Sequence, residues 1–426
     1  MRIRPAMARL LVALVAALGL AAPAAAAPTV VTISFDDGWV DQYQARDILN
    51  ARGMRATFYV NARFTGLAGR MTTTQLRQLQ ADGHEIGGHS LTHMHLPAQS
   101  VDEQRRQICD DRASLLGQGF AVRSFAYPYG ENDATTRSIV AACGYRSART
   151  VDGIGSVACL STCPAAEAVP PLDPMATRTP PGVRDTTTLA DLQTLVTRAE
   201  SRGGGWVQIF FHQLCDGCGI YGAKPSLLAA FADWLATRAA SGTVVRTAGE
   251  VVGGTVAPPV LGPARTGNLL RNPSFEADAD ANGVPDCWVR TGYGVNTFTW
   301  SRMNGARTGL FAELLAISAL TSGDRKLITT MDAPGGCAPW ATPGHAYAIG
   351  EWYMSSAPVR FVLYARSGAG TWAFWAKSPY VPAATAWTPT TWVTPPLPAD
   401  ATAVSGGLAL DRPGTLLVDD AVLTER

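Results

Sequence analysis

The order of strand and helix signals in residues 30–83 is the feature that most constrains the fold. Two short apolar runs, Val30–Ile33 and Ala56–Val60, are rich in β-branched and aromatic residues and predict buried strands. Each is followed by a stretch of helical character, Asp41–Arg52 after the first and Thr72–Ala81 after the second. Strand, helix, strand, helix is the rhythm of βαβ units, so the sequence predicts an α/β fold with a parallel sheet or barrel.

Two adjacent carboxylates, Asp36 and Asp37, follow the first strand in Ser34-Phe-Asp-Asp-Gly38. Like charges this close raise each other's pKa unless a cation or a proton relieves them. The alternative is an ordinary Asp-Gly turn, which is common without any function. These residues alone leave both interpretations open.

A cluster of histidines decides in favour of function. Four of the six histidines fall between His84 and His95. His89 and His93 are four residues apart, so both imidazoles point the same way if they share a helical turn. Two imidazoles and one carboxylate are the ligand set of a catalytic metal site that keeps positions open for water. For His84 and His95 we expect structural roles.

Two further polar motifs end apolar strands. Ser124–Ala126 runs into Tyr127-Pro-Tyr-Gly130, and Trp206–Phe211 runs into His212. Catalytic groups of α/β barrels gather at the carboxyl ends of the strands. The sequence therefore predicts one site that combines these motifs with the aspartates and histidines above.

Together the motifs resemble the polysaccharide deacetylase family, carbohydrate esterase family four, with its chitooligosaccharide-deacetylase homology domain. The matching segments are, in chain order, Ser34-Phe-Asp-Asp-Gly38, His89-Ser-Leu-Thr-His93, Tyr127-Pro-Tyr-Gly130 and Phe210-Phe-His212. They span most of the N-terminal half. The resemblance implies a distorted (β/α) barrel of about seven strands.

Carried over residue by residue, the resemblance makes Asp37, His89 and His93 the ligands of one divalent metal. Zinc fits this ligand type best, with cobalt or nickel as alternatives. Asp36 would be the general base, His212 the general acid, and the backbone N–H of Tyr129 an oxyanion donor. The implied substrate is an N-acetylated polysaccharide such as chitin, peptidoglycan glycan or poly-N-acetylglucosamine. The alternatives are an acetylxylan esterase and a non-catalytic glycan-binding protein.

Two positions depart from the family pattern. The family's arginine two residues before the motif proline pairs with the base, and Ala126 stands in its place. We predict that Arg178 supplies the missing cation to Asp36, the alternative being an ordinary surface arginine. The family's aspartate-and-tryptophan motif, which supports the acid histidine, is not clearly matched in this sequence. Asp185 is the candidate for its aspartate. We expect the long loop Asp152–Pro181 to form either a wall of the substrate groove or mere decoration.

The N-terminus, residues 1–27, is typical of a secretory signal peptide, with a basic start, an apolar core and an Ala-rich cleavage zone. We therefore expect a secreted, extracellular protein with no membrane span, because the apolar run is too short. Removing Arg2, Arg4 and Arg9 changes the net charge from 35 − 34 = +1 to 32 − 34 = −2. A near-neutral chain has no electrostatic footprint for nucleic acid, and we expect a monomer whose partner is the glycan.

The chain after residue 27 is too long for a single hydrophobic core, and its amino-acid composition changes along its length. We expect a deacetylase domain over residues 28–252, a Gly/Pro-rich linker over 253–266 and a second domain over 267–426. The second domain shows alternating runs and frequent turn signals, which predict an all-β sandwich. Its ends, Asn268–Glu276 and Leu417–Leu423, resemble jelly-roll carbohydrate-binding modules.

Eight cysteines in an exported chain favour disulfides over free thiols. We expect Cys287 to pair with Cys337, and Cys109 with Cys143 between two helices. The remaining four close two small loops, cross-pair or hold zinc: Cys159, Cys163, Cys215 and Cys218.

An acidic turn opens the second domain. Oxygen-bearing side chains surround a glycine at four positions whose spacing suits calcium, the alternative being a solvated turn: Asp278, Asp280, Asn282 and Asp286.

Overall fold

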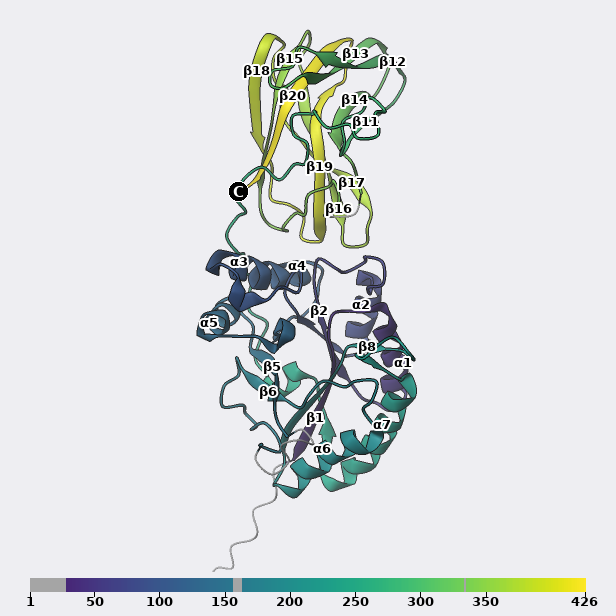
Figure 1. Ribbon diagram of the computed structural model, residues 1–426, viewed down its shortest axis with the longest axis vertical. Helices are drawn as coiled ribbons and strands as arrows, with labels where there is room; N and C mark the ends of the chain where they lie inside the picture. The colour runs from purple at the N-terminus through teal and green to yellow at the C-terminus, as the bar shows by residue number, and fades with distance from the viewer. Residues whose placement is uncertain (1–27, 156–162, 333–334) are drawn as a thin grey trace, which may run out of the picture.

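The computed structural model describes residues 28–155, 163–332 and 335–426 (Figure 1). The predicted signal peptide and Cys159 lie outside these residues. In the described part of the chain no helix combines the length and the apolar character needed to cross a membrane. Figure 1 shows a barrel wrapped by helices, with an antiparallel sandwich stacked on one side of it.

Seven parallel strands form a nearly closed barrel in the order β7-β1-β2-β3-β4-β5-β6, as the sequence predicts. Between β6 and β7 the amide of Gln208 bridges the gap, because its Nε2 donates to Thr177 Oγ1 at 3.0 Å and to the Arg178 carbonyl at 3.2 Å. A short strand, β10 (Val244–Val245), pairs with the start of β1. The barrel strands are β1 (Thr29–Phe35), β2 (Ala56–Val60), β3 (Glu85–Gly88), β4 (Ser124–Ala126), β5 (Ser147–Gly153), β6 (Thr177–Thr179) and β7 (Gly205–Phe211).

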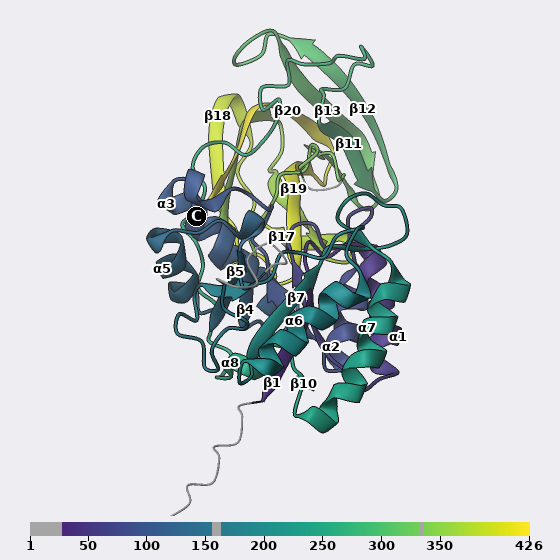
Figure 2. The same ribbon diagram turned by 60° about the horizontal axis from the view of Figure 1, so that its bottom comes forward.

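Helices cover the outside of the barrel, and Figure 2 shows α6 and α7 crossing in front of it. Helix α2 begins after Thr72, whose Oγ1 accepts a hydrogen bond from Gln75 N while the Gln75 side chain accepts one from Thr72 N. The helix predicted at residues 41–52 is a 3₁₀ turn, Val40–Gln44, that continues into α1. The helices are α1 (Ala45–Asn50), α2 (Thr73–Ala81), α3 (Val101–Arg105), α4 (Asp111–Gly117), α5 (Ala134–Ala142), α6 (Leu189–Ser201), α7 (Pro225–Arg238) and α8 (Ala248–Val252).

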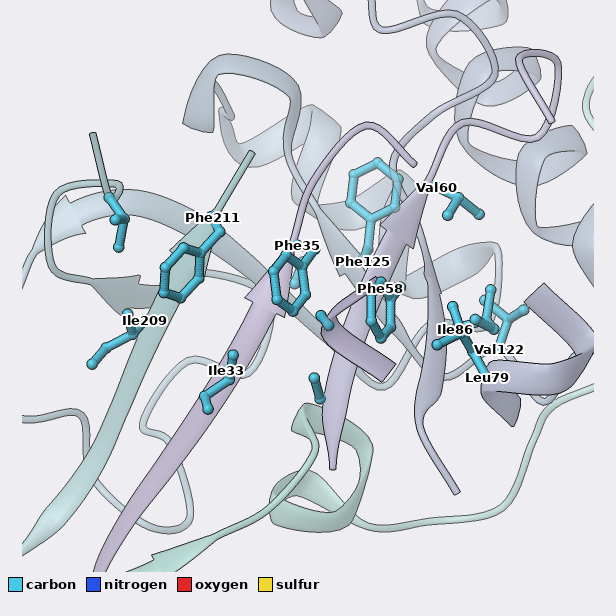
Figure 3. Close-up of a cluster of buried hydrophobic side chains, with 14 of the residues drawn as sticks. Ile33, Phe35, Phe58, Val60, Leu79, Ile86, Val122, Phe125, Ile209 and Phe211 are labelled. Carbon is cyan, nitrogen blue, oxygen red and sulfur yellow. The ribbon is translucent and has the colours of Figure 1, made fainter. Parts of the chain in front are cut away.

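Aromatic rings pack between the barrel strands that carry the predicted site and the surrounding helices (Figure 3). The ring of Phe35 stacks on Phe58 at 4.9 Å and on Phe211 at 5.4 Å, centroid to centroid. Full burial of each such side chain stabilises the fold by about 1.5–3 kcal/mol. These contacts hold the carboxyl ends of β1, β2 and β7 in a fixed relation to one another.

The C-terminal part is the predicted all-β sandwich. One sheet has the order β11-β14-β19-β16-β17 and the other the order β12-β13-β20-β15-β18, all antiparallel. Its resemblance to a carbohydrate-binding jelly roll stays a prediction. The strands are β11 (Trp288–Tyr293), β12 (Asn296–Asn304), β13 (Phe311–Leu320), β14 (Asp324–Thr329), β15 (Tyr347–Ser355), β16 (Arg360–Ser367), β17 (Trp372–Lys377), β18 (Ala384–Val393), β19 (Ala401–Leu410) and β20 (Gly414–Glu425).

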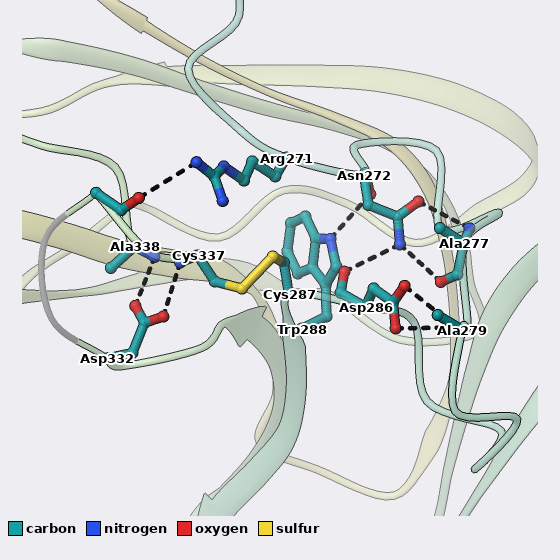
Figure 4. The surroundings of a disulfide bond; sticks show 11 residues. Arg271, Asn272, Ala277, Ala279, Asp286, Cys287, Trp288, Asp332, Cys337 and Ala338 are labelled. Atoms are coloured by element: carbon teal, nitrogen blue, oxygen red, sulfur yellow. Dashed lines mark hydrogen bonds between the residues drawn. A yellow bond between two sulfur atoms is a disulfide. The ribbon is translucent and has the colours of Figure 1, made fainter.

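Three of the predicted cysteine pairings are present: Cys109–Cys143, Cys215–Cys218 and Cys287–Cys337. Cys163 is also disulfide-bonded. Around the last bridge, Asp332 accepts hydrogen bonds from the backbone N–H groups of Cys337 and Ala338 (Figure 4). The zinc alternative for Cys215 and Cys218 is therefore wrong.

The linker is tied down along its length, although its composition suggests little to bury. The guanidinium of Arg112, itself fully buried, donates to the carbonyls of Ala257 at 2.8 Å and Pro258 at 3.1 Å. Asp110 accepts a hydrogen bond of 2.7 Å from the N–H of Gly262. Backbone groups that apolar side chains could not anchor are held by buried charged groups of the barrel.

Asp110, which lies where the barrel meets the sandwich, is expected to make the stability of the protein depend on pH. His345 of the sandwich lies with its Nε2 3.9 Å from Asp110 Oδ1. Burial raises the pKa of Asp110 from 3.8 to about 7, an effect that the Gly262 hydrogen bond and Arg63 offset only in part. Because the folded pKa is the higher one, the stability contributed by Asp110 is present below pH 3.8 and is lost as pH rises through about 7.

Asp110→Asn is therefore expected to remove part of the fall in melting temperature between these two pH values, since the amide keeps an acceptor for Gly262 and does not ionise. Calorimetric melts over this pH range measure the effect. The exposed Asp47→Asn serves as the control, with an unchanged slope. An unaltered pH profile in Asp110→Asn contradicts the assignment.

Candidate active site

The structure brings the predicted catalytic and metal-ligating residues, all except Arg178, together in one cavity of about 340 Å³ at the carboxyl ends of the barrel strands. A cavity of this size can hold a small ligand or part of a larger one. Strands end here because buried apolar runs give way to polar residues, as at Phe35 and Asp36. The lining residues are Asp36, Asp37, His89, His93, Tyr127, Tyr129, Val151, Gly182, Arg184, Phe210, His212 and Tyr221.

Asp37, His89 and His93 form a candidate metal site. Asp37 Oδ1 lies 3.5 Å from His89 Nε2 and 3.4 Å from His93 Nε2, and one donor atom from each residue falls within 4.8 Å of the others. Asp37 has a φ of 74° and His93 a φ of 56°, in the left-handed region that non-glycine residues rarely adopt. Strained backbone of this kind is typical of positions over-determined by a functional site.

His89 and His93 do not share the helical turn on which their spacing would align them. They lie in an irregular loop after β3 in which Ser90 also has a positive φ of 65°. Ser90 Oγ accepts a hydrogen bond of 3.0 Å from the N–H of His93. The loop nevertheless brings the imidazole centroids to 4.8 Å from each other.

The surroundings of His89 fit a metal ligand. Its ring is buried, and its Nδ1 lies 2.7 Å from the carbonyl oxygen of Ala126. A carbonyl only accepts, so Nδ1 carries the proton and the lone pair of Nε2 faces Asp37. This donor set, one carboxylate and two imidazoles, fits a divalent metal.

Asp36 is paired with Arg149, a residue that the sequence reasoning missed. The Arg149 guanidinium donates through Nη2 to Asp36 Oδ1, and both side chains are almost fully buried. The arginine also lies 4.3 Å from the centroid of the Phe210 ring. Burial raises the pKa of the Asp36 carboxyl, but Arg149, His89 and His212 outweigh burial and hold the pKa below its ordinary value.

The predicted pairing of Arg178 with Asp36 is wrong. Arg178 Nε and Nη2 instead donate to Glu167 at 2.9 and 2.8 Å. Strand register explains the difference, because Ala126 on β4 stands directly opposite Arg149 on β5. The guanidinium that was expected at position 126 is therefore supplied by Arg149, the residue opposite on the neighbouring strand. Arg149 lies inside β5, in the largely polar run Ser147–Gly153, so no strand-end pattern in the sequence indicated it.

His212 lies where predicted, at the end of β7, with its ring centroid 5.0 Å from that of Tyr221. Burial lowers the pKa of His212, and Asp36 and Asp37 oppose this effect only in part. Among the described residues, no hydrogen-bond partner reaches its buried Nδ1. Asp185 therefore does not support His212 in this structure.

Tyr129 forms the opposite rim of the cavity. It has a φ of 58°, and its ring stacks on His95 with centroids 3.9 Å apart. His95 Nδ1 in turn pairs with Glu131 at 2.9 Å. His84 is buried away from the cavity, where its Nδ1 accepts from Ala56 N at 3.1 Å. Both histidines thus have the structural roles expected of them, His84 beside β2 and His95 through its stacking on Tyr129.

The walls of the cavity differ from the prediction. Of its described residues, the loop Asp152–Pro181 contributes none to the lining, and it contains β6. The wall beside His212 comes instead from Gly182, Arg184 and Tyr221. Tyr221 follows the small loop closed by the Cys215–Cys218 disulfide.

The acidic turn of the sandwich brings Asp278, Asp280 and Asp286 within 4.8 Å, donor to donor. Asp278 Oδ2 already accepts from Arg302 at 2.9 Å, and the Asp286 carboxylate accepts from the N–H of Ala279 at 3.1 Å. Asn282 Nδ2 donates to Asp280 at 2.7 Å. Calcium at this turn stays a prediction.

Comparison with known proteins supports a polysaccharide deacetylase domain in the N-terminal part of the chain. Residues 24–148 match the family described as Polysaccharide deacetylase. The chitooligosaccharide deacetylase of Azorhizobium caulinodans is 32% identical over 134 residues, which cover 30% of this chain and 61% of that protein. The chitin deacetylase of Colletotrichum lindemuthianum is 30% identical over 121 residues, 28% of this chain and 49% of that protein.

A third relative, the putative polysaccharide deacetylase YxkH of Bacillus subtilis, is 27% identical over 125 residues, 29% of this chain and 44% of that protein. The chain thus spans about half the length of the curated relatives it matches. Among solved structures, a family 4 carbohydrate esterase from Streptomyces lividans in complex with acetate is 20% identical, covers 51% of this chain and 91% of that chain, and has a TM-score of 0.34.

Proposed function

We propose that this protein is a secreted, metal-dependent polysaccharide deacetylase that hydrolyses the N-acetyl groups of N-acetylglucosamine-containing glycans. The observation that carries the proposal is the convergence of the three metal-ligand candidates Asp37, His89 and His93 with a buried carboxylate and a histidine in one cavity. The sequence similarity to a chitin deacetylase and a chitooligosaccharide deacetylase points to the same substrate class. The signal-peptide pattern of residues 1–27 and the disulfides support secretion.

Asp37, His89 and His93 would hold the metal, and their donor types favour zinc over cobalt or nickel. A divalent metal bound there supplies Lewis-acid polarisation of the acetyl carbonyl and lowers the pKa of a coordinated water. The hydrogen bond from His89 Nδ1 to Ala126 sets the ring so that only Nε2 is available as a ligand.

The other residues move protons and stabilise charge. Asp36 accepts a proton from the attacking water as general base, and Arg149 keeps this carboxylate ionised and oriented. The N–H of Tyr129 donates to the oxyanion that forms on the acetyl group. His212 then gives its proton to the departing nitrogen, because an amine anion is a poor leaving group.

The alternatives use the same residues differently. An acetylxylan esterase needs the same base and metal but depends less on the acid, since an alkoxide leaves more readily than an amine anion. The binding-only alternative supposes that catalysis was lost together with the arginine that pairs with the base, because Ala126 stands in that arginine's position. The Arg149–Asp36 pair restores that cation and argues against the binding-only alternative.

Acetate release tests the proposal. With zinc added, we expect release from N-acetylglucosamine oligomers in excess of release from acetylxylan, and loss of activity after chelation that zinc restores. Asp37→Asn is expected to lose bound zinc, measured by elemental analysis, together with activity, because one of three protein ligands is weakened. Release from acetylxylan alone assigns the esterase, and zinc-loaded protein without release from any acetylated glycan assigns the binding protein.

For the sandwich we infer glycan binding as a monomeric module, supported by exposed aromatic side chains that offer stacking surfaces. Tyr293 on β11 is 65% exposed and Phe374 on β17 is 57% exposed. The tryptophans of the sandwich offer less surface, because Trp288 is buried and the others are half-buried: Trp300, Trp340, Trp352, Trp372, Trp375, Trp387 and Trp392. The calcium assignment at Asp278 and its neighbours rests on their oxygen donors alone.

A further inference from the structure

Arg184 is a cation of the cavity that the proposed chemistry does not use. It lines the cavity and its side chain is exposed. The side-chain contact that the structure gives it is with an aromatic ring, because its guanidinium carbon lies 5.6 Å from the centroid of Tyr221. By contrast, Arg149 and Arg178 each pair with a carboxylate. Within the described residues no ion pair joins Arg184 to an acidic group, so its charge is available to a ligand.

The position of Arg184 relates it to one part of the substrate. Its partner Tyr221 contacts His212, with the ring centroids 5.0 Å apart. Under the proposed function His212 protonates the departing nitrogen, so the sugar that carries this nitrogen lies on the same side of the cavity. A substituent that reaches Arg184 therefore belongs to the acetylated sugar or to its neighbour in the chain.

The charges of the site favour an anionic substituent. Arg149 neutralises the charge of Asp36. The single negative charge of Asp37 would offset only half of the positive charge of a divalent metal held there. With the metal bound, Arg184 adds to a positive surplus, which attracts anions into a cleft. A guanidinium presents its N–H groups in a fork that matches the two oxygens of a carboxylate, and Tyr221 limits the orientations of this fork.

We propose that Arg184 binds a carboxylate on the acetylated sugar or its neighbour, so that the substrate is an acidic N-acetylated glycan. The proposal rests on the proposed function and names its substrate class. Two kinds of glycan carry a carboxylate on the acetylated sugar or on its neighbour. One has the lactyl ether of muramic-type sugars, and the other alternates N-acetylglucosamine with a uronic acid.

Steady-state acetate release from three glycans tests the proposal with the zinc-loaded full chain. The glycans are neutral N-acetylglucosamine oligomers, peptide-free strands that contain N-acetylmuramic acid, and oligomers that contain glucuronic acid. Arg184→Gln is expected to lower kcat/KM on one of the acidic glycans about tenfold more than on the neutral oligomers, the size of a lost charge-assisted hydrogen bond. The glycan that shows the larger loss identifies the carboxylate. The exposed Arg202→Gln, outside the cavity, is the matched control and leaves all three rates unchanged.

Binding separates this proposal from the proposed function. Calorimetric titration of the zinc-loaded protein is expected to show a lower Kd for an acidic glycan than for neutral oligomers, and Arg184→Gln is expected to remove the difference. This result supports the role of Arg184 even if no glycan releases acetate, an outcome that would refute only the deacetylase activity. Equal Kd values for acidic and neutral glycans in the wild type, or equal losses on all glycans in Arg184→Gln, overturn the proposal.

Discussion

Asp36→Asn is expected to lower kcat for acetate release by roughly 10²- to 10⁴-fold, the usual contribution of a general base. The amide keeps the size of the side chain but accepts no proton. Zinc content is expected to stay at the wild-type level, because Asp36 is not among the three ligand candidates. Activity assays and elemental analysis on the same preparation measure both quantities.

The control for this variant is Asp152→Asn, which changes an exposed aspartate at the end of β5 that does not line the cavity. Its rate is expected to equal that of the wild type. If Asp36→Asn keeps more than about a tenth of the wild-type rate with full zinc, Asp36 is not the base.

Arg149→Met is expected to destabilise the protein by about 3–5 kcal/mol, because it leaves the buried Asp36 carboxylate without its cation. It is also expected to lower turnover, since the base loses the group that keeps it ionised. Denaturant unfolding monitored by circular dichroism gives the change in the free energy of unfolding.

A double-mutant cycle makes this prediction specific. Arg149→Met combined with Asp36→Asn is expected to cost less than the sum of the single changes, since the two side chains are in contact. Arg178→Met combined with Asp36→Asn is expected to be additive, because Arg178 pairs with Glu167. Coupling between Asp36 and Arg178, together with additivity at Arg149, would contradict the contacts described above.

Most of the candidate site was predictable because its residues follow local rules. Asp36, Asp37 and His212 each stand directly after an apolar strand, and parallel strands place their carboxyl ends at one edge of the barrel. The helix start at Thr72 followed in the same way from capping chemistry. Such inferences need only the residues next to one another in the chain.

The predictions that the structure contradicts mainly concern contacts between residues far apart in the chain. The residues next to Arg178 and Arg149 do not indicate which of the two meets Asp36; Arg149 does so because β5 runs beside β4 with Arg149 opposite Ala126. Spacing alone would align the two histidines on a helical turn, whereas they lie in a loop with left-handed backbone at Ser90 and His93. The Gly/Pro-rich composition of the linker gives no sign that the buried Arg112 holds its carbonyls.

The sequence by itself determined the barrel, the sandwich and the chemical types gathered at the barrel's edge, because apolar periodicity and strand ends are local properties. Only the tertiary structure decided which arginine neutralises Asp36 and which one, Arg184, remains available to a ligand. The first outcome depends on the register between β4 and β5, and the second on loops that meet only in the folded chain. Parallel strands are joined by long crossovers rather than by tight turns, so no short stretch of sequence sets which residues lie opposite each other.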